Sequence, residues 1–272
     1  MTIADVSPAV VKAAQQGDRA AVEEVLLSVQ DKIYNLAHRV LINPDDAREA
    51  TQEILIQLLT KLSTFRAESA FSTWAYRIAI RHILSAKKLR DRDPGLTFEM
   101  FAADLETGLV ADPPDAPDQA LLLNELRVSC TMAMLLCLSM DLRLAYVLGD
   151  VFELDQSEAS AILELEPATY RKRLSRARAE VIAFTSRHCG LVGTETKCSC
   201  PRRLPAALEA GRVQRGSYPN SAGSRLSYSQ ARAEIGAVIE ELKTFKLHQS
   251  VPYRDCPQDI RSVLTRILSP GL

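Results

Sequence analysis

Residues 155–187, DQSEASAILELEPATYRKRLSRARAEVIAFTSR, decide the fold of the region around them, because they read as two helices joined by a short turn. Ser157 can accept hydrogen bonds from the unpaired N–H groups of a helix start, so we expect it to cap the first helix. Ala159 and Ile162 follow at the spacing of a helix that faces a core. Pro167 disfavours helix at the residue before it but fits the first turn of a second helix. The stretch therefore predicts a helix–turn–helix unit.

The second helix of this unit carries most of the local positive charge. Its basic residues are Arg171, Lys172, Arg173, Arg176, Arg178 and Arg187, with Glu180 as the opposing acid. Its apolar residues, at spacings of three and four, are Leu174, Ala177, Val181 and Phe184. An α-helix fits the major groove of DNA, and the phosphates of DNA attract a basic face. We therefore predict DNA recognition by this helix; the alternative is a solvated basic face on an ordinary bundle helix.

The composition sets limits on the class of protein. The chain has 272 residues, 47% hydrophobic and 25% charged, with a net charge of −1. These values are ordinary for a globular protein of two small domains, so a nucleic-acid partner would need a local basic surface. The N-terminus does not resemble a signal peptide, and the most apolar run, Cys130–Leu138, is too short to span a bilayer. We expect a cytoplasmic protein without a membrane partner, in which Cys130 and Cys137 are reduced core residues.

The N-terminal part of the chain predicts a helical domain. Apolar periodicity indicates helices over residues 8–16, 21–40 and 47–62. A polar loop follows at 63–70, and Ser72 can cap the next helix, which ends in Lys87, Lys88 and Arg90.

This loop and the helix after it interleave aromatic and basic residues. They include Phe65, Phe71, Trp74, Arg77 and Arg81. Such a set suits single-stranded nucleic acid, because rings stack on exposed bases while cations follow the phosphates. The alternative is that the aromatic rings close a small hydrophobic core.

Two segments resemble one family. Residues 46–79, DAREATQEILIQLLTKLSTFRAESAFSTWAYRIA, resemble region 2 of the extracytoplasmic-function sigma factors, the promoter-recognition subunits of bacterial RNA polymerase. Residues 167–178, PATYRKRLSRAR, resemble the recognition helix of region 4 in the same family. The resemblance covers residues 8–187 and implies an all-α fold. It divides the chain into a region 2 domain (1–90), a flexible linker (91–118), a region 4 helix–turn–helix domain (119–187) and a cysteine-containing extension (188–272).

The family resemblance also implies roles for individual residues. Those expected on the largest subunit of core polymerase are Asp46, Arg48, Glu49, Gln52 and Glu53. Those expected to capture melted bases of the upstream ten-element are Phe65, Arg66, Ser69, Phe71, Ser72, Trp74, Arg77 and Arg81. Those expected to read the minus-thirty-five element are Thr169, Tyr170, Arg171, Lys172, Arg173 and Arg176. The sequence departs from the family pattern at Tyr170, where a small aliphatic residue is usual, and in its more basic Arg171–Arg173 run.

These roles require no catalysis by this chain. The sequence has no Gly-rich phosphate loop and no constellation of acid, base and nucleophile, so we expect it not to be an enzyme and to require no cofactor. The expected partners are core RNA polymerase and promoter DNA, and an anti-sigma factor is a further candidate. The alternative is a stand-alone helix–turn–helix regulator with a metal- or thiol-sensing tail. A more distant alternative is a metal or thiol sensor whose DNA contact is secondary.

Segments outside the two motifs give weaker patterns. Residues 91–118 are rich in Pro, Asp and Gly and are expected to run extended. Two helices are expected after them, at 119–138 and 141–152. Residues 201–228 look flexible, 229–247 predict a helix and 257–268 a short last one. We expect this tail to fold back on the sigma domains and regulate them.

The extension contains a group of cysteines. Cys189, Cys198 and Cys200 could supply three thiolates to Zn²⁺, which favours four N or S ligands, and the segment resembles tails found in one subset of the family. The fourth ligand could be His188, His248 or Cys256. The alternatives are free thiols or a redox pair of Cys189 with Cys198 or with Cys200.

Overall fold

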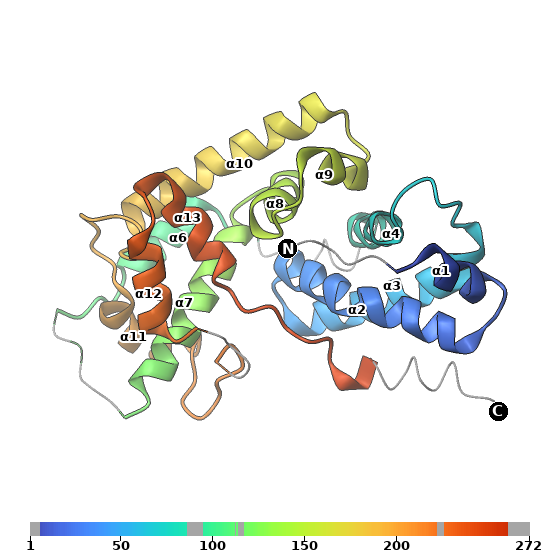
Figure 1. The fold of residues 1–272 in the computed structure, drawn as a ribbon. Helices are drawn as coiled ribbons and strands as arrows, with labels where there is room; N and C mark the ends of the chain where they lie inside the picture. Colours follow the sequence, from blue (N-terminus) through green and yellow to red (C-terminus); the bar gives the residue numbers. More distant parts are fainter. Residues whose placement is uncertain (1–5, 86–94, 112, 114–116, 222–225, 261–272) are drawn as a thin grey trace. The chain divides into compact units, whose positions relative to one another are not determined.

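The computed structural model describes residues 6–85, 95–111, 113, 117–221 and 226–260, and over these ranges its regular structure is helical, apart from one isolated bridge between Gln214 and Ser217 (Figure 1). The predicted all-α fold is confirmed. The chain forms two compact units. Unit 1 comprises residues 1–93, 153–171 and 254–272, and unit 2 comprises residues 94–152 and 172–253. None of the helices within the described ranges is long and apolar enough to cross a membrane.

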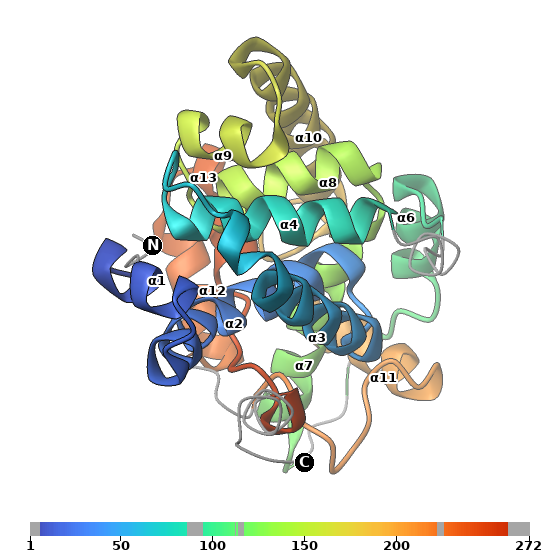
Figure 2. The same cartoon turned by 90° about the vertical axis from the view of Figure 1, so that its right-hand side faces the viewer.

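Unit 1 is built from the helices predicted for the N-terminal part of the chain. They are α1 (Pro8–Gln15), α2 (Arg19–Leu41), α3 (Pro44–Lys61), the short 3₁₀ helix η1 (Leu62–Thr64), α4 (Phe71–Ser85) and, from later in the sequence, α9 (Gln156–Leu163) (Figures 1 and 2). Side chains cap α1 to α3: Ser7, Asp18 and Asn43 each accept from backbone N–H groups of the first turn.

The core of unit 1 follows the predicted apolar periodicity. Its fully buried residues include Val25, Leu26, Ile33, Leu36, Ile54, Leu55, Leu58, Ala79 and Ile83. Because these residues repeat every three or four positions, each helix of the unit has one apolar stripe that the others cover.

Two residues that were predicted to cap helices, Ser157 and Ser72, occupy other positions in the structure. Asp155, not Ser157, caps α9, and its carboxylate accepts from Glu158 N at 2.8 Å. Both residue types are good caps, so sequence alone did not separate them. Helix α4 begins at Phe71, which places Ser72 inside the helix and buries it at 5% exposure.

Unit 2 combines much of the predicted region 4 domain with residues 188–253 of the C-terminal extension. Its helices are α6 (Phe98–Glu106), α7 (Gln119–Leu136), α8 (Met140–Tyr146), the π-helical turn η2 (Val147–Val151), α11 (Cys200–Glu209), α12 (Tyr228–Ala237) and α13 (Glu240–Gln249). Helix α10 (Pro167–His188) begins at the predicted proline and contributes residues from 172 onward to this unit.

The prediction that residues 91–118 run extended is wrong for α6. Thr97 caps this helix by accepting from Met100 N at 3.2 Å. Phe101 and Leu105 are buried, and the Phe101 ring stacks on Phe184 with centroids 5.4 Å apart. Helix α6 is only nine residues long and lies between acidic and proline-rich segments, so its apolar periodicity was not recognised in the sequence.

The extension shares one core with the predicted region 4 helices. Residues of α6, α7, α10, α11, α12 and α13 all contribute, among them Leu105, Leu126, Phe184, Leu204, Ile235 and Leu247. The predicted flexible segment 201–228 therefore contains a helix and buried residues, namely α11, Val213 and Tyr228. The predicted helix at 229–247 is two helices, because Val238 adopts an extended conformation between them.

A buried polar network connects the extension to α7. Glu125, 3% exposed, accepts from Asn220 N at 2.9 Å, from Asn220 Nδ2 at 2.7 Å and from Ser221 N at 2.7 Å. Arg127 donates to Ser250 Oγ at 2.6 Å. Buried charged groups are costly without partners, so these contacts fix the extension at defined positions on α7.

The described end of the chain belongs to unit 1. Asn35 on α2 donates to Arg254 O at 2.6 Å and accepts from Arg254 N at 2.9 Å, and Cys256 N donates to Asp31 Oδ1 at 2.8 Å. Cys256 and Ile260 are buried. Residues 258–260 are helical, and the rest of the helix predicted at 257–268 lies outside the described residues.

Candidate nucleic-acid interface

Three aromatic rings form a platform where the 65–70 loop meets α4. The ring centroids of Phe65, Phe71 and Trp74 are 5.4 Å apart in each of the three pairs. Phe71 is buried, whereas Phe65 and Trp74 are partly exposed. Phe71 thus supports two rings that keep accessible surface, which is what stacking on a base requires.

The loop that carries Phe65 is held by α1. Gln15 Nε2 donates to Leu62 O at 3.1 Å and to Phe65 O at 2.8 Å. Ala67 adopts a left-handed conformation, with φ of 56°, at the point where the loop turns. Arg66 is exposed and Ser69 half-buried. The loop is therefore positioned by backbone contacts while its side chains stay available.

The two arginines of α4 contact the C-terminal end of α9. Arg77 Nε donates to Ala161 O at 2.8 Å, and Arg81 forms two hydrogen bonds with the carboxylate of Glu164. Glu164 is the left-handed C-cap of α9, with φ of 55°. Cations are favourable at a helix C-terminus, where carbonyls lack partners. Arg77 and Arg81 are thus bound within the chain in this structure.

The basic face of α10 is largely exposed, but three of its residues have partners or are buried. Thr169, Arg171, Lys172 and Arg176 are exposed, and Arg176 Nε donates to Glu180 Oε1 at 3.0 Å. Arg173 is half-buried and pairs with Asp141 at 2.9 Å. Tyr170 is 1% exposed, so the prediction that it contacts DNA is wrong in this conformation, and its size fills the core position where the family usually has a small aliphatic residue.

Arg178, which the sequence groups with the basic residues of α10, serves the fold. Its guanidinium donates to both carboxylate oxygens of Asp150, with Nε to Oδ2 at 2.9 Å and Nη2 to Oδ1 at 2.6 Å, and lies 5.6 Å from the centre of the Phe245 ring. The buried Asp150 therefore connects α10 to η2, and Arg178 is not part of the open basic face.

The polar face of α3 carries most of the residues expected to bind polymerase. Arg48 and Glu53 are exposed, and Glu49 and Gln52 are half-buried. Asp46 is 5% exposed in the first turn of the helix, where an acidic residue favours the helix dipole. Asp46 therefore has a structural position rather than a docking one.

Burial also changes the roles of other predicted residues. Phe71 and Ser72 are buried and can position the loop but not touch a base in this conformation. Lys87, Lys88 and Arg90 lie outside the described residues. His82 on α4 is buried as well, and burial lowers its pKa against the opposing effects of Glu53 and Glu49.

The three predicted zinc ligands lie in unit 2 and are partly buried. Burial raises the pKa values of the Cys189, Cys198 and Cys200 thiols. As their side chains stand, no three or more His, Cys, Asp or Glu residues of the described ranges are arranged to hold a metal ion.

None of the three expected fourth ligands joins these thiols. His248 is buried with Nδ1 3.2 Å from the Tyr146 hydroxyl, His188 lies 4.0 Å from a Glu106 oxygen, and Cys256 belongs to unit 1. Cys130 on α7 packs against the same core as these thiols, in keeping with the apolar run in which it lies.

Comparisons with known proteins identify the relatives of this chain. Residues 26–93 match the family Sigma-70 region 2. The chain is 31% identical over 171 residues to the RNA polymerase sigma-H factor of Pseudomonas aeruginosa, covering 62% of this chain and 88% of that protein. It is 30% identical over 170 residues to the ECF RNA polymerase sigma-E factor of Escherichia coli, with the same coverage of 62% and 88%. A solved structure of CnrH in complex with the cytosolic domain of CnrY is similar at a TM-score of 0.46 and 20% identity, covering 65% of this chain and 96% of that chain.

Proposed function

Since the chain belongs to the extracytoplasmic-function sigma factors of bacterial RNA polymerase, we propose that it binds core RNA polymerase and directs it to promoters. In this proposal the polymerase performs the chemistry, and this chain acts in the cytoplasm without a catalytic role. An anti-sigma factor remains a prediction from the family resemblance. The relatives do not favour the alternative of a stand-alone regulator.

The aromatic platform is the observation that carries the proposal. Phe65 and Trp74 keep accessible ring surface beside the exposed Arg66, and Gln15 holds the loop in place. An unstacked base must leave the duplex to reach such a surface, so the platform suits DNA that the polymerase has melted. We assign it to the upstream ten-element. Base stacking contributes about 1–3 kcal/mol per base, which is enough to stabilise one captured base.

The open face of α10 supports recognition of the minus-thirty-five element. Arg171 can form bidentate bonds to guanine in the major groove, and Arg176 can do so once its exposed pair with Glu180 opens, whereas Lys172 can position the protein on phosphate. Arg173 can join them only when its pair with Asp141 opens.

DNA binding by α4 in this proposal includes a release step. Arg77 and Arg81 cannot follow a DNA backbone while they are bound to Ala161 and Glu164. The Arg81–Glu164 pair is exposed on both sides, and exposed pairs contribute little to stability, so DNA phosphates can displace it.

Transcription in vitro tests the proposal. The full chain is added to bacterial core polymerase on a pool of genomic promoter fragments, and transcript ends are mapped. We expect start sites that require both proteins and are lost or much weakened in Trp74→Ala. The matched control is Met100→Ala, because Met100 is an exposed apolar residue of α6. Sequence-specific duplex binding by the chain alone, without any new start site, would instead establish the stand-alone regulator.

A further inference from the structure

The described end of the extension lies on α2 of unit 1. Asn35 Nδ2 donates to Arg254 O at 2.6 Å, and Arg254 N donates to Asn35 Oδ1 at 2.9 Å. Cys256 N donates to Asp31 Oδ1 at 2.8 Å. Because Asp31 and Asn35 are four positions apart on one helix, both contacts come from the same face of α2. Residues 254–260 are called the tail below.

The side-chain amide of Asn35 is fully used when the tail is in place. An amide side chain can donate two hydrogen bonds and accept two. Within α2, Asn35 donates to Asp31 O at 2.7 Å and accepts from Arg39 Nη1 at 2.9 Å. Its other two bonds go to the N–H and C=O groups of Arg254. Asn35 is 0% exposed, so water or another peptide must replace these bonds when the tail leaves. This face of α2 is therefore built to bind the backbone of a peptide segment.

Two side chains of the tail are buried in unit 1. Cys256 is 2% exposed and Ile260 is 1% exposed. Residues 252–257 are not helical, whereas the last described residues, 258–260, are. The tail thus combines backbone hydrogen bonds in a non-helical stretch with apolar anchors, as bound peptides commonly do. One buried isoleucine side chain favours the bound state by roughly 10- to 150-fold.

The tail also reaches the face of α3 that is expected to meet the polymerase. Asp259 Oδ2 lies 3.7 Å from Arg48 Nε, and the two side chains are 58% and 50% exposed. Such an exposed pair contributes little to stability, so it does not hold the tail in place. It shows instead where the tail lies, because Arg48 is one of the residues expected to contact the largest subunit of core polymerase.

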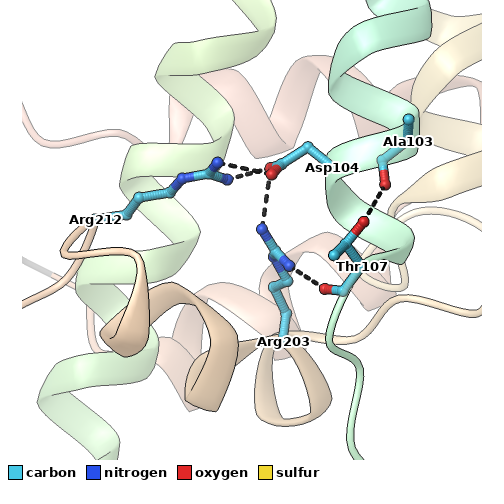
Figure 3. Close-up of polar contacts among 5 residues, drawn as sticks. All are labelled: Ala103, Asp104, Thr107, Arg203 and Arg212. Atoms are coloured by element: carbon cyan, nitrogen blue, oxygen red, sulfur yellow. Dashed lines mark hydrogen bonds and ion pairs between the residues drawn. The ribbon is translucent and has the colours of Figure 1, made fainter.

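The rest of the extension has its own anchors in unit 2. Arg203 and Arg212 both bind the carboxylate of Asp104, as Figure 3 shows, with Arg203 Nη2 3.0 Å from Oδ2 and Arg212 Nη2 2.6 Å from Oδ1. Arg203 also donates to Thr107 O, and the hydrogen bonds of Glu125 described above add further contacts. All of these residues belong to unit 2. The tail can therefore leave α2 while the rest of the extension stays folded.

From these contacts we propose that the tail occupies a peptide-binding site on α2 and that core polymerase displaces it when it docks on α3. The inference rests on the proposed function, because it concerns the same docking face. A polymerase subunit bound at Arg48 takes the place of Asp259 and of the tail residues beside it, since two partners cannot occupy one surface. The tail is then a competitor within the chain. The apparent affinity for core polymerase is the affinity of the detached state multiplied by the fraction of molecules in that state.

The thiol of Cys256 reports directly on the position of the tail. It is buried while the tail is bound, so a maleimide reagent labels it slowly, and detachment exposes it. The full chain is labelled under native conditions with and without core polymerase, and the labelled cysteines are identified by mass spectrometry. We expect core polymerase to speed the labelling of Cys256 by about tenfold or more, because the apolar anchors favour the bound tail by at least that factor.

Variants of the full chain separate the anchors from the exposed ion pair. Ile260→Asp places a charge at a buried anchor, so Cys256 should be labelled rapidly without polymerase, and the affinity for core polymerase should rise by about tenfold or more. Asp259→Lys keeps the anchors and removes the exposed pair, so that affinity should rise by less than about fivefold. The matched control is Met100→Asp, which changes an exposed apolar residue of α6 and should behave as wild type in both measurements.

Each outcome supports or overturns a stated part of the proposal. Unchanged labelling of Cys256 in a chain that has bound core polymerase overturns the displacement. Equal or weaker binding of core polymerase by Ile260→Asp overturns the competition, and slow labelling of Cys256 in that variant overturns the anchored site on α2. If neither wild type nor any variant binds core polymerase, the proposed function fails and the displacement with it, whereas rapid labelling in Ile260→Asp still supports the site on α2.

Discussion

The buried carboxylate of Glu125 gives the sharpest test of whether the extension is part of unit 2. Glu125→Ala removes the acceptor of Asn220 N, Asn220 Nδ2 and Ser221 N. Asn220 is 9% exposed and Glu125 3%, so water cannot fully replace the lost bonds. A buried donor without a partner costs about 1–3 kcal/mol, and the deleted side chain leaves a cavity in addition. We expect unit 2 to lose about 3 kcal/mol of stability.

Native-state hydrogen exchange measures this loss locally. A change of about 3 kcal/mol corresponds to roughly 100-fold faster opening at about 1.4 kcal/mol per factor of ten. The faster exchange should appear in α7, α11 and α12 together, because they share one core. A global melting curve is less suitable, since a chain of two units does not unfold in one step.

Two further variants make the result interpretable. Glu125→Gln keeps one acceptor oxygen and should show an intermediate effect. Glu195→Ala removes an exposed carboxylate of the same unit and should change exchange by less than about threefold, because surface substitutions are usually within about 0.5 kcal/mol. If Glu125→Ala matched Glu195→Ala, or if only the extension exchanged faster, the extension would not be integrated with α7.

Three other predictions concern DNA recognition and pH. Arg171→Ala should relax base preference at one position of the minus-thirty-five element by about 1–3 kcal/mol. Lys172→Ala should instead weaken binding to all DNA sites equally and reduce the salt dependence of the affinity. A binding-site selection with each variant, repeated at two salt concentrations, measures both effects. Glu164→Gln should raise promoter affinity of the holoenzyme, by less than about fivefold because exposed pairs contribute under about 1 kcal/mol. Burial lowers the pKa of His248 to about 4, so unit 2 should lose up to about 3 kcal/mol between pH 6.5 and pH 4 and then level off.

The sign of the pH effect follows from proton uptake. Between pH 6.5 and pH 4 the unfolded chain binds a proton at His248 and the folded chain does not, so stability falls as the pH falls. His248→Gln should remove most of this slope, and an unchanged slope would contradict the assignment. For the DNA predictions, equal effects of Arg171→Ala and Lys172→Ala on every site would contradict base reading, and lower affinity in Glu164→Gln would contradict the release step.

Local patterns in the sequence predicted the helices of unit 1 and the start of α10. Residues such as Ile33, Ile54 and Leu58 repeat with the period of a helix, and Pro167 sets a boundary by its own geometry. The family motifs predict a nucleic-acid surface on the loop and α4, and the relatives support the family.

The features that sequence did not predict depend on contacts between distant segments. Helix α6 is stabilised by packing on Phe184 of α10, and Tyr170 is buried by its surroundings rather than by its own neighbours in sequence. The hydrogen bonds between Asn35 and the backbone of Arg254 could not be predicted either, because the two residues are far apart in the sequence.

Capture of a melted base by the aromatic platform is the central claim, and a fluorescent base analogue tests it most directly. The analogue is placed in the upstream ten-element of a promoter found by the transcription experiment, and polymerase holoenzyme containing this chain is added. Stacking on Phe65 and Trp74 should change the fluorescence and hold the base with about 1–3 kcal/mol that Trp74→Ala removes, a loss of roughly 5- to 150-fold in affinity. Equal binding of the base by wild type and Trp74→Ala holoenzymes would contradict the account.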